Sequence, residues 1–126
     1  MEPESLTWHT DLDAAWAASR QHGVPLLLFV TSDHCTFCTR MKDGTLNHPG
    51  VTSVVNGAFV PLVLHAKSES RLLQELRVVY YPTTFVISPQ AVVLARIDGY
   101  ISPTDLARRL SALKAPAGVA NTAQGR

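Results

Sequence analysis

The sequence predicts an α/β fold in which helices cover both faces of a central mixed β-sheet. Segments with helical periodicity alternate with short apolar runs, in the order helix, strand, helix, strand, helix, hairpin, helix. The 126 residues are 46% hydrophobic and 17% charged, as in an ordinary globular protein with one core. We place this domain at residues 1–114 and expect a flexible tail at residues 115–126, which lack periodicity.

The chain begins with a predicted helix and a buried strand. Thr10 precedes an acidic segment and is the expected N-cap of a helix that stops at Gly23. Residues 25–31 are almost continuously apolar, as in a strand that is covered on both faces. The next helix is expected to open at Cys35 and to fade at residues 43–44.

A short extra helix and a second strand are predicted next. The helix is expected at Pro49–Val55, with Asn47 or His48 near its start. Residues 59–64 are interpreted as a second central strand. Because proline has no N–H to donate, Pro61 must lie near the beginning of that strand or on an unpaired edge.

The last third of the chain predicts a helix, a β-hairpin and a final helix. Ser68 is the expected cap of the first helix, and residues 83–87 and 92–97 are expected to pair across residues 88–90. Ser102 starts the final helix, with proline at the first helical position and an acid at the third. The first of these helices carries Leu72, Leu73 and Leu76, and the buried stripe of the last is expected at Leu106, Leu110 and Leu113.

Charge and hydropathy exclude several classes of function. The formal net charge is +1 and the charges are interspersed, so we expect no nucleic-acid partner. No apolar run approaches the roughly 18 residues of a transmembrane helix, so we expect no membrane span. No secretory signal is visible, so the expected compartment is the cytoplasm or, if a signal peptide was removed, the periplasm.

The chemistry is expected at Cys35-Thr36-Phe37-Cys38, which contains both cysteines of the chain. If Cys35 opens a helix, Cys38 lies one turn later and the sulfurs face each other, with Cys35 at the end that favours a thiolate. The alternatives are half of a zinc site or two inert core thiols. Structural zinc usually takes four protein ligands, no second C-x-x-C exists, and His34, His48 and His65 lack a suitable spacing, so we expect no metal.

Three motifs follow one another along the chain. An apolar strand leads to Cys35-x-x-Cys38, a Pro-Thr pair in Tyr80-Tyr81-Pro82-Thr83-Thr84-Phe85 leads into a second strand, and Asp98-Gly99-Tyr100 precedes the last helix. In this order they resemble the active-site helix, the cis-proline segment and the final strand of the thioredoxin-like superfamily. The resemblance covers about residues 6–113. It is strongest to small thioredoxin-like proteins of bacteria, in which an extra helix often follows the active-site helix.

The resemblance implies a thiol–disulfide oxidoreductase that acts on protein substrates. Cys35 would be the nucleophile that attacks a substrate disulfide, and Cys38 would resolve the mixed disulfide. Pro82 would be cis and packed against the sulfurs, and the backbone of Tyr81 would pair with an extended substrate. No cofactor is expected, a partner protein would regenerate the couple, and the chain is expected to be a monomer.

The departures from thioredoxins proper concern the neighbours of the cysteines. His34 replaces a tryptophan, Thr36-Phe37 replaces Gly-Pro, and Phe29 stands where a buried acid precedes the first cysteine by six residues. His34 could stabilise the thiolate and Phe37 could contact substrate, while Asp33 is a possible stand-in for the acid. The alternative functions are a glutaredoxin-like enzyme that uses glutathione and a non-enzymatic thioredoxin-fold binding module.

Overall fold

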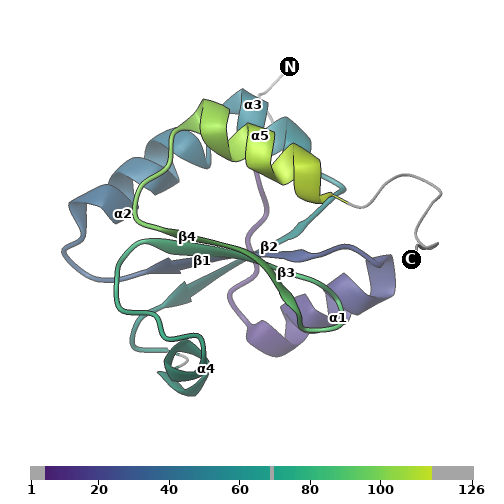
Figure 1. The fold of residues 1–126 in the computed structure, drawn as a ribbon, viewed down its shortest axis with the longest axis horizontal. Coiled ribbons are helices and arrows are strands. Elements are labelled where there is room, and N and C mark those ends of the chain that lie inside the picture. Colours follow the sequence, from purple (N-terminus) through teal and green to yellow (C-terminus); the bar gives the residue numbers. More distant parts are fainter. Residues whose placement is uncertain (1–4, 69, 115–126) are drawn as a thin grey trace.

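A mixed β-sheet forms the middle layer of the protein in the computed structural model, which describes residues 5–68 and 70–114 (Figure 1). Within these residues the sheet has four strands in the order β2-β1-β3-β4. Strand β1 pairs in parallel with β2 and antiparallel with β3, and β3 pairs antiparallel with β4. The bounds are Leu26–Thr31 for β1, Val60–His65 for β2, Thr83–Ile87 for β3 and Val93–Asp98 for β4. The predicted mixed sheet and hairpin are therefore confirmed.

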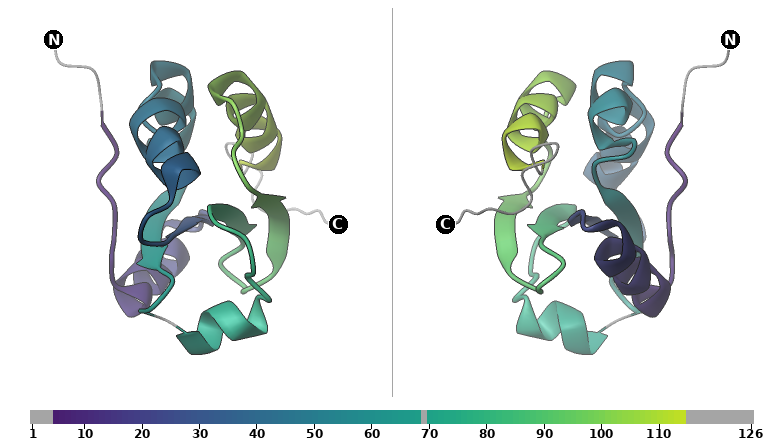
Figure 2. Two further views of the ribbon diagram at one scale, coloured as in Figure 1. Left: turned by 90° about the vertical axis from the view of Figure 1, so that its left-hand side faces the viewer. Right: turned by 90° about the vertical axis from the view of Figure 1, so that its right-hand side faces the viewer.

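Helices cover both faces of this sheet, as predicted (Figures 1 and 2). On one face lie α2 (Thr36–Arg40), its π-helical continuation η1 (Met41–Thr45), α3 (Pro49–Val55) and α5 (Pro103–Leu113). On the other lie α1 (Leu12–His22) and α4 (Ser70–Glu75). The alternation of side chains along β1 divides the core accordingly, since Leu27 and Phe29 pack on the first face and Leu26, Leu28 and Val30 on the second.

Most helix ends lie where capping residues predicted them. His48 caps α3, and the hydroxyl of Ser102 accepts a hydrogen bond from the Asp105 N–H at 3.2 Å. The prediction for α1 was wrong by one residue, because Asp11 and not Thr10 accepts the N–H of Ala14, at 2.8 Å.

Helix α4 begins at Ser70, two residues after the predicted cap Ser68. Residue 69, which precedes the helix, lies outside the described residues. The proposed tail at residues 115–126 also lies outside the described residues. None of the helices in the described part of the chain is long and apolar enough to cross a membrane.

Strand β2 lies at the edge of the sheet and not in its centre, which corrects the sequence prediction. Pro61 is the second residue of β2. Proline has no backbone N–H to donate to a neighbouring strand, so it is tolerated near the start of a strand at the edge of a sheet. An extended segment runs beside the outer edge of β2, where the His9 N–H donates to the Pro61 carbonyl and the Val63 N–H donates to the His9 carbonyl, both at 2.9 Å.

The register of the strands brings the three motifs of the sequence to one end of the sheet. Because β1 and β3 run antiparallel, Val30 at the end of β1 pairs with Thr83 at the start of β3. Thr83 in turn pairs with Asp98 at the end of β4. The cysteines, the Pro-Thr segment and the glycine before α5 therefore converge at the end of the sheet where β1 leads into α2.

Candidate active site

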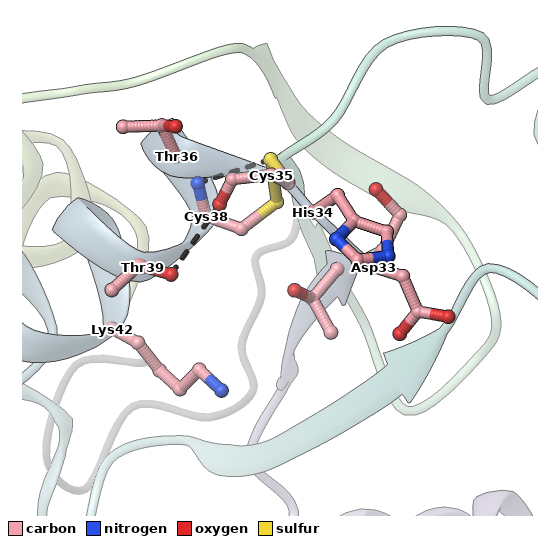
Figure 3. Close-up of a pocket in the computed structure, with 9 residues that line it drawn as sticks. Asp33, His34, Cys35, Thr36, Cys38, Thr39 and Lys42 are labelled. Carbon is pink, nitrogen blue, oxygen red and sulfur yellow. Dashed lines mark hydrogen bonds between the residues drawn. A yellow bond between two sulfur atoms is a disulfide. The ribbon is translucent and has the colours of Figure 1, made fainter.

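The two cysteines occupy the junction between the loop after β1 and helix α2. Cys35 is the N-cap of α2 with an extended backbone, and its sulfur accepts a hydrogen bond from the backbone N–H of Cys38 at 3.1 Å. The two residues form a disulfide with a Cα–Cα distance of 5.2 Å. Cys35 is partly exposed whereas Cys38 is only 2% exposed. The pair therefore presents one accessible sulfur and one sulfur that faces the core (Figure 3).

The segment before β3 lies directly beside the accessible sulfur. The Cys35 sulfur is 3.6 Å from the carbonyl oxygen of Tyr81, and the Tyr81–Pro82 peptide bond is cis. The Thr83 hydroxyl donates to the Tyr80 carbonyl at 2.6 Å, and the Gly99 N–H donates to the Pro82 carbonyl at 2.7 Å. These two hydrogen bonds join residues 80–82 to the first residue of β3 and to the residue that follows β4. They hold the Tyr81 carbonyl next to the Cys35 sulfur.

His34 and Phe37 are both exposed next to the disulfide. The backbone of His34 has a φ of 54°, in the left-handed region that a residue other than glycine rarely adopts. The Phe37 side chain is 51% exposed, and its ring lies 6.4 Å from the ring of Tyr100. The predicted site residues thus lie around one end of the sheet: Cys35, Cys38, His34, Phe37, Tyr81 and Pro82.

An open pocket of about 510 Å³ lies beside the cysteines (Figure 3). In this view Lys42 and His34 lie on opposite sides of the disulfide. The Thr39 hydroxyl, which also borders the pocket, donates to the Cys35 carbonyl at 3.4 Å. The pocket is lined by Thr31, Ser32, Asp33, His34, Cys35, Thr36, Cys38, Thr39 and Lys42.

Asp33 is a poor replacement for a buried catalytic acid. Its carboxylate is exposed and is bound by His65 Nε2 at 2.9 Å and by Lys67 Nζ at 3.4 Å. The hydrogen bond and the charge of His65, followed by the hydrogen bond of Lys67, hold the pKa of Asp33 below its ordinary value of 3.8. A carboxylate with a lowered pKa has a reduced affinity for a proton, so it is a weak base for a thiol.

Phe29 fills the position of the missing acid with an apolar side chain. It is 1% exposed, and its ring lies 6.3 Å from the ring of Trp8. A small cavity of about 180 Å³ adjoins this ring and is lined by Trp8, Phe29, Lys42 and Val63. None of these four residues carries a carboxyl group, so this cavity offers no acid at the position where the family pattern leads us to expect one.

Sequence reasoning did not place Thr39 or Tyr100 beside the site, and it interpreted Arg40 and Lys42 mainly as a solvated face of the helix, with substrate steering as the lesser alternative. The helical spacing was a usable signal for three of them, since Thr39 lies four residues after Cys35, Arg40 three after Phe37, and Lys42 four after Cys38. Tyr100 follows the glycine of the third motif, but its contact with Phe37 depends on how α2 lies against the loop before α5.

The comparison with known families agrees with this arrangement. The sequence model of a family described as a thioredoxin-like domain matches residues 12–114. The chain belongs to the thioredoxin-like domain family. The match includes both cysteines and the Pro82-Thr83 pair, and it spans every helix and strand of the described structure.

Solved structures show the same fold for this thioredoxin-like domain. It is similar to a thioredoxin from Thermus thermophilus, with a TM-score of 0.77 and 24% identity over 86% of this chain and 87% of the other. A putative disulphide-isomerase from Bacteroides thetaiotaomicron gives 0.74 and 18%, over 87% and 93%. The oxidised C-terminal domain of DsbD from Neisseria meningitidis gives 0.69 and 20%, over 85% and 99%. No curated protein sequence matches the chain significantly.

The chemistry available to this thioredoxin-like domain comes from its two sulfurs. Among the described residues, no three His, Cys, Asp or Glu side chains come together in a way that could hold a metal ion. Both sulfurs are bonded to each other in the structure. A disulfide whose outer sulfur is accessible can be opened by an incoming thiolate and re-formed from a dithiol.

Proposed function

We propose that this protein is a thiol–disulfide oxidoreductase that exchanges disulfides with protein substrates through the Cys35–Cys38 couple. The observation that carries the proposal is the asymmetry of the pair. The partly exposed Cys35 sulfur receives the N–H of Cys38, while the Cys38 sulfur is buried one helical turn deeper. An accessible sulfur with a hydrogen-bond donor suits a nucleophile, and a buried neighbour suits a resolving thiol.

Reduction of a substrate would proceed in two exchanges. In the dithiol form, the Cys35 thiolate attacks one sulfur of the substrate disulfide, and a bond to Cys35 forms while the substrate bond breaks. The leaving substrate sulfur takes a proton from water. Cys38 then loses its thiol proton to solvent and attacks the Cys35 sulfur, which releases the second substrate sulfur. Two electrons pass to the substrate, and the protein is left with the disulfide present in the structure.

The residues around Cys35 would position the substrate. The Tyr81 backbone, held beside the Cys35 sulfur and next to Pro82, would pair with an extended substrate segment as an added strand pairs with a sheet. Exposed Phe37 would contact apolar substrate side chains, and His34 would favour the Cys35 thiolate when its imidazole is protonated. No cofactor takes part in these steps, and a second redox protein would regenerate the couple.

The similar structures add support at the level of the fold. Their printed names describe a thioredoxin, a putative disulphide-isomerase and a domain of DsbD. These names are consistent with disulfide exchange in either direction. The direction depends on the reduction potential of the Cys35–Cys38 couple, which the same fold can hold at very different values.

One experiment tests the function and its direction together. The couple is equilibrated with glutathione buffers to obtain its reduction potential, and turnover is measured with a protein disulfide as substrate. A potential near about −270 mV would indicate a reductase and one near about −120 mV an oxidant. Absence of turnover with protein disulfides, together with rapid reduction of a glutathione mixed disulfide, would overturn the proposed substrate class. Cys35→Ser is the control that should abolish turnover.

A further inference from the structure

A cation lies over two aromatic rings next to the active-site motif. The Cζ atom of Arg40 lies 5.7 Å from the centroid of the Phe37 ring and 5.6 Å from the centroid of the Tyr100 ring. Phe37 belongs to the C-x-x-C motif, Arg40 follows it by one helical turn, and Tyr100 comes from the loop that leads into α5, which passes beside α2 (Figure 1). The three side chains form a platform, the Phe37–Arg40–Tyr100 platform, in which Arg40 and Tyr100 have no role in the steps above.

We propose that Arg40 binds a carboxylate of the disulfide substrate, so that this protein favours disulfides flanked by an acidic residue. This inference rests on the proposed function and names a substrate class for the same site. The cation–π contacts with the two rings help to hold the guanidinium in place, and its coplanar N–H groups can form a two-pronged contact with a carboxylate.

The charges around the platform favour an anionic partner. Among the described residues Arg40 makes no salt bridge, whereas the carboxylate of Asp33 is already bound by His65 and Lys67. Arg40 borders a shallow pocket of about 400 Å³ that also contains Asp43, but these two side chains do not form an ion pair. The guanidinium is therefore the unneutralised group that an incoming carboxylate would meet.

The position of Arg40 also sets where that carboxylate must lie in the substrate. Arg40 follows Cys35 by five residues along a helical segment, which corresponds to an axial distance of roughly 7–8 Å. An extended substrate advances about 3.3 Å per residue. An acidic residue two or three positions from the attacked cysteine would therefore reach the guanidinium while the cysteine lies at the Cys35 sulfur.

The test uses the reduced protein of 126 residues and three disulfides in single-turnover reactions. Two are disulfide-linked peptides that are identical except for Asp or Lys two residues from the attacked cysteine. The third is 2-hydroxyethyl disulfide, which has no charge and cannot reach the platform. Two electrons pass from the Cys35 and Cys38 thiols to each substrate, and the released thiols are measured by chromatography.

The expected result for the wild-type protein is a rate constant about three- to fivefold higher with the Asp peptide, a preference that shrinks in high salt. Arg40→Glu should reverse this preference, and its rate with 2-hydroxyethyl disulfide reports separately any general effect of the charge change on the Cys35 thiolate. Arg109→Glu makes the same change of charge at an exposed position of α5 and should leave the preference intact. Circular dichroism and urea unfolding establish that both variants are folded.

Two outcomes overturn the inference in distinguishable ways. If the wild-type protein reduces both peptides equally fast, or if Arg40→Glu slows both peptides alike, Arg40 does not select acidic substrates although the oxidoreductase function stands. If the reduced wild-type protein transfers electrons to none of the three disulfides, the proposed function fails and the substrate preference fails with it.

Discussion

The backbone N–H of Cys38 lies 3.1 Å from the sulfur of Cys35, so the buried cysteine supplies a hydrogen-bond donor to the accessible one. The same sulfur lies 3.6 Å from the Tyr81 carbonyl, which comes from a segment 46 residues further along the chain. A donor stabilises a thiolate, whereas a carbonyl oxygen accepts a hydrogen bond only from the thiol. The nearer of the two groups, the Cys38 N–H, favours the thiolate of Cys35.

The first prediction concerns the relative reactivity of the two thiols. In the reduced protein, Cys35 should be alkylated by iodoacetamide at pH values well below about 8.5, where an ordinary thiol is still protonated. Cys38 should react more slowly because its side chain is 2% exposed. Mass spectrometry of the digested protein at a series of pH values gives both rates. Equal and slow labelling of the two residues would contradict the assignment of Cys35 as the nucleophile.

The second prediction follows from the order of the two exchanges. Cys38→Ser should retain the attack by Cys35 but stop at the mixed disulfide, because no thiol remains to resolve it. Non-reducing electrophoresis should show a covalent adduct with a protein disulfide substrate, and dithiothreitol should release it. Cys35→Ser is the matched control and should form little adduct, since Cys38 is buried. If both variants trap substrate equally, the two sulfurs do not have distinct roles.

Local signals predicted the elements of this fold well. The hairpin of β3 and β4 and the helix that starts at Ser102 follow from turn and capping residues that are adjacent in the sequence. Thr10 was mistaken for a cap because Asp11 beside it is an equally good acceptor, and only the structure shows which of them receives the Ala14 N–H. The central position predicted for β2 was wrong, because the pairing of Leu26 with Val60 is not encoded by any neighbouring residue.

The candidate site divides in the same way between local and distant contacts. The spacing of Cys35 and Cys38 predicted that their sulfurs would meet, and they form a disulfide. The contact of Phe37 with Tyr100 joins residues from opposite halves of the chain, and no periodicity anticipates it. The same holds for Asp33 and His65, whose pairing depends on β1 and β2 ending at the same edge of the sheet. Such contacts require the packed structure.

The third prediction concerns this Asp33–His65 pair. Because His65 and Lys67 stabilise the ionised carboxylate, the pKa of Asp33 should lie below 3.8 in the folded protein. The resulting stabilisation is present above the unfolded pKa and is lost as the pH falls through the lower, folded pKa. NMR titration of the Asp33 carboxyl carbon should give a midpoint that rises toward 3.8 in His65→Gln. Lys67→Gln should cause a smaller rise, and an unchanged midpoint in His65→Gln would contradict the prediction.

The fourth prediction compares two neighbouring threonines at the start of β3. Thr83 and Thr84 are both fully buried, and the Thr83 hydroxyl donates to the Tyr80 carbonyl at 2.6 Å. Among the described residues, the Thr84 hydroxyl has no hydrogen-bond partner. A buried hydroxyl without a partner costs about 1–3 kcal/mol, and valine has nearly the same shape without that cost. Thr84→Val should therefore raise the free energy of unfolding, by about 1–2 kcal/mol.

Thr83→Val is the matched control, because it makes the same chemical change one residue earlier. It removes a hydrogen bond that holds the segment beside the Cys35 sulfur, so it should lower the free energy of unfolding by about 1 kcal/mol. Urea unfolding of the wild-type protein and both variants measures the two effects, and an unchanged m-value shows that the comparison concerns the same transition. If Thr84→Val is less stable than the wild-type protein, its hydroxyl makes a hydrogen bond and the two threonines contribute to the fold in the same way.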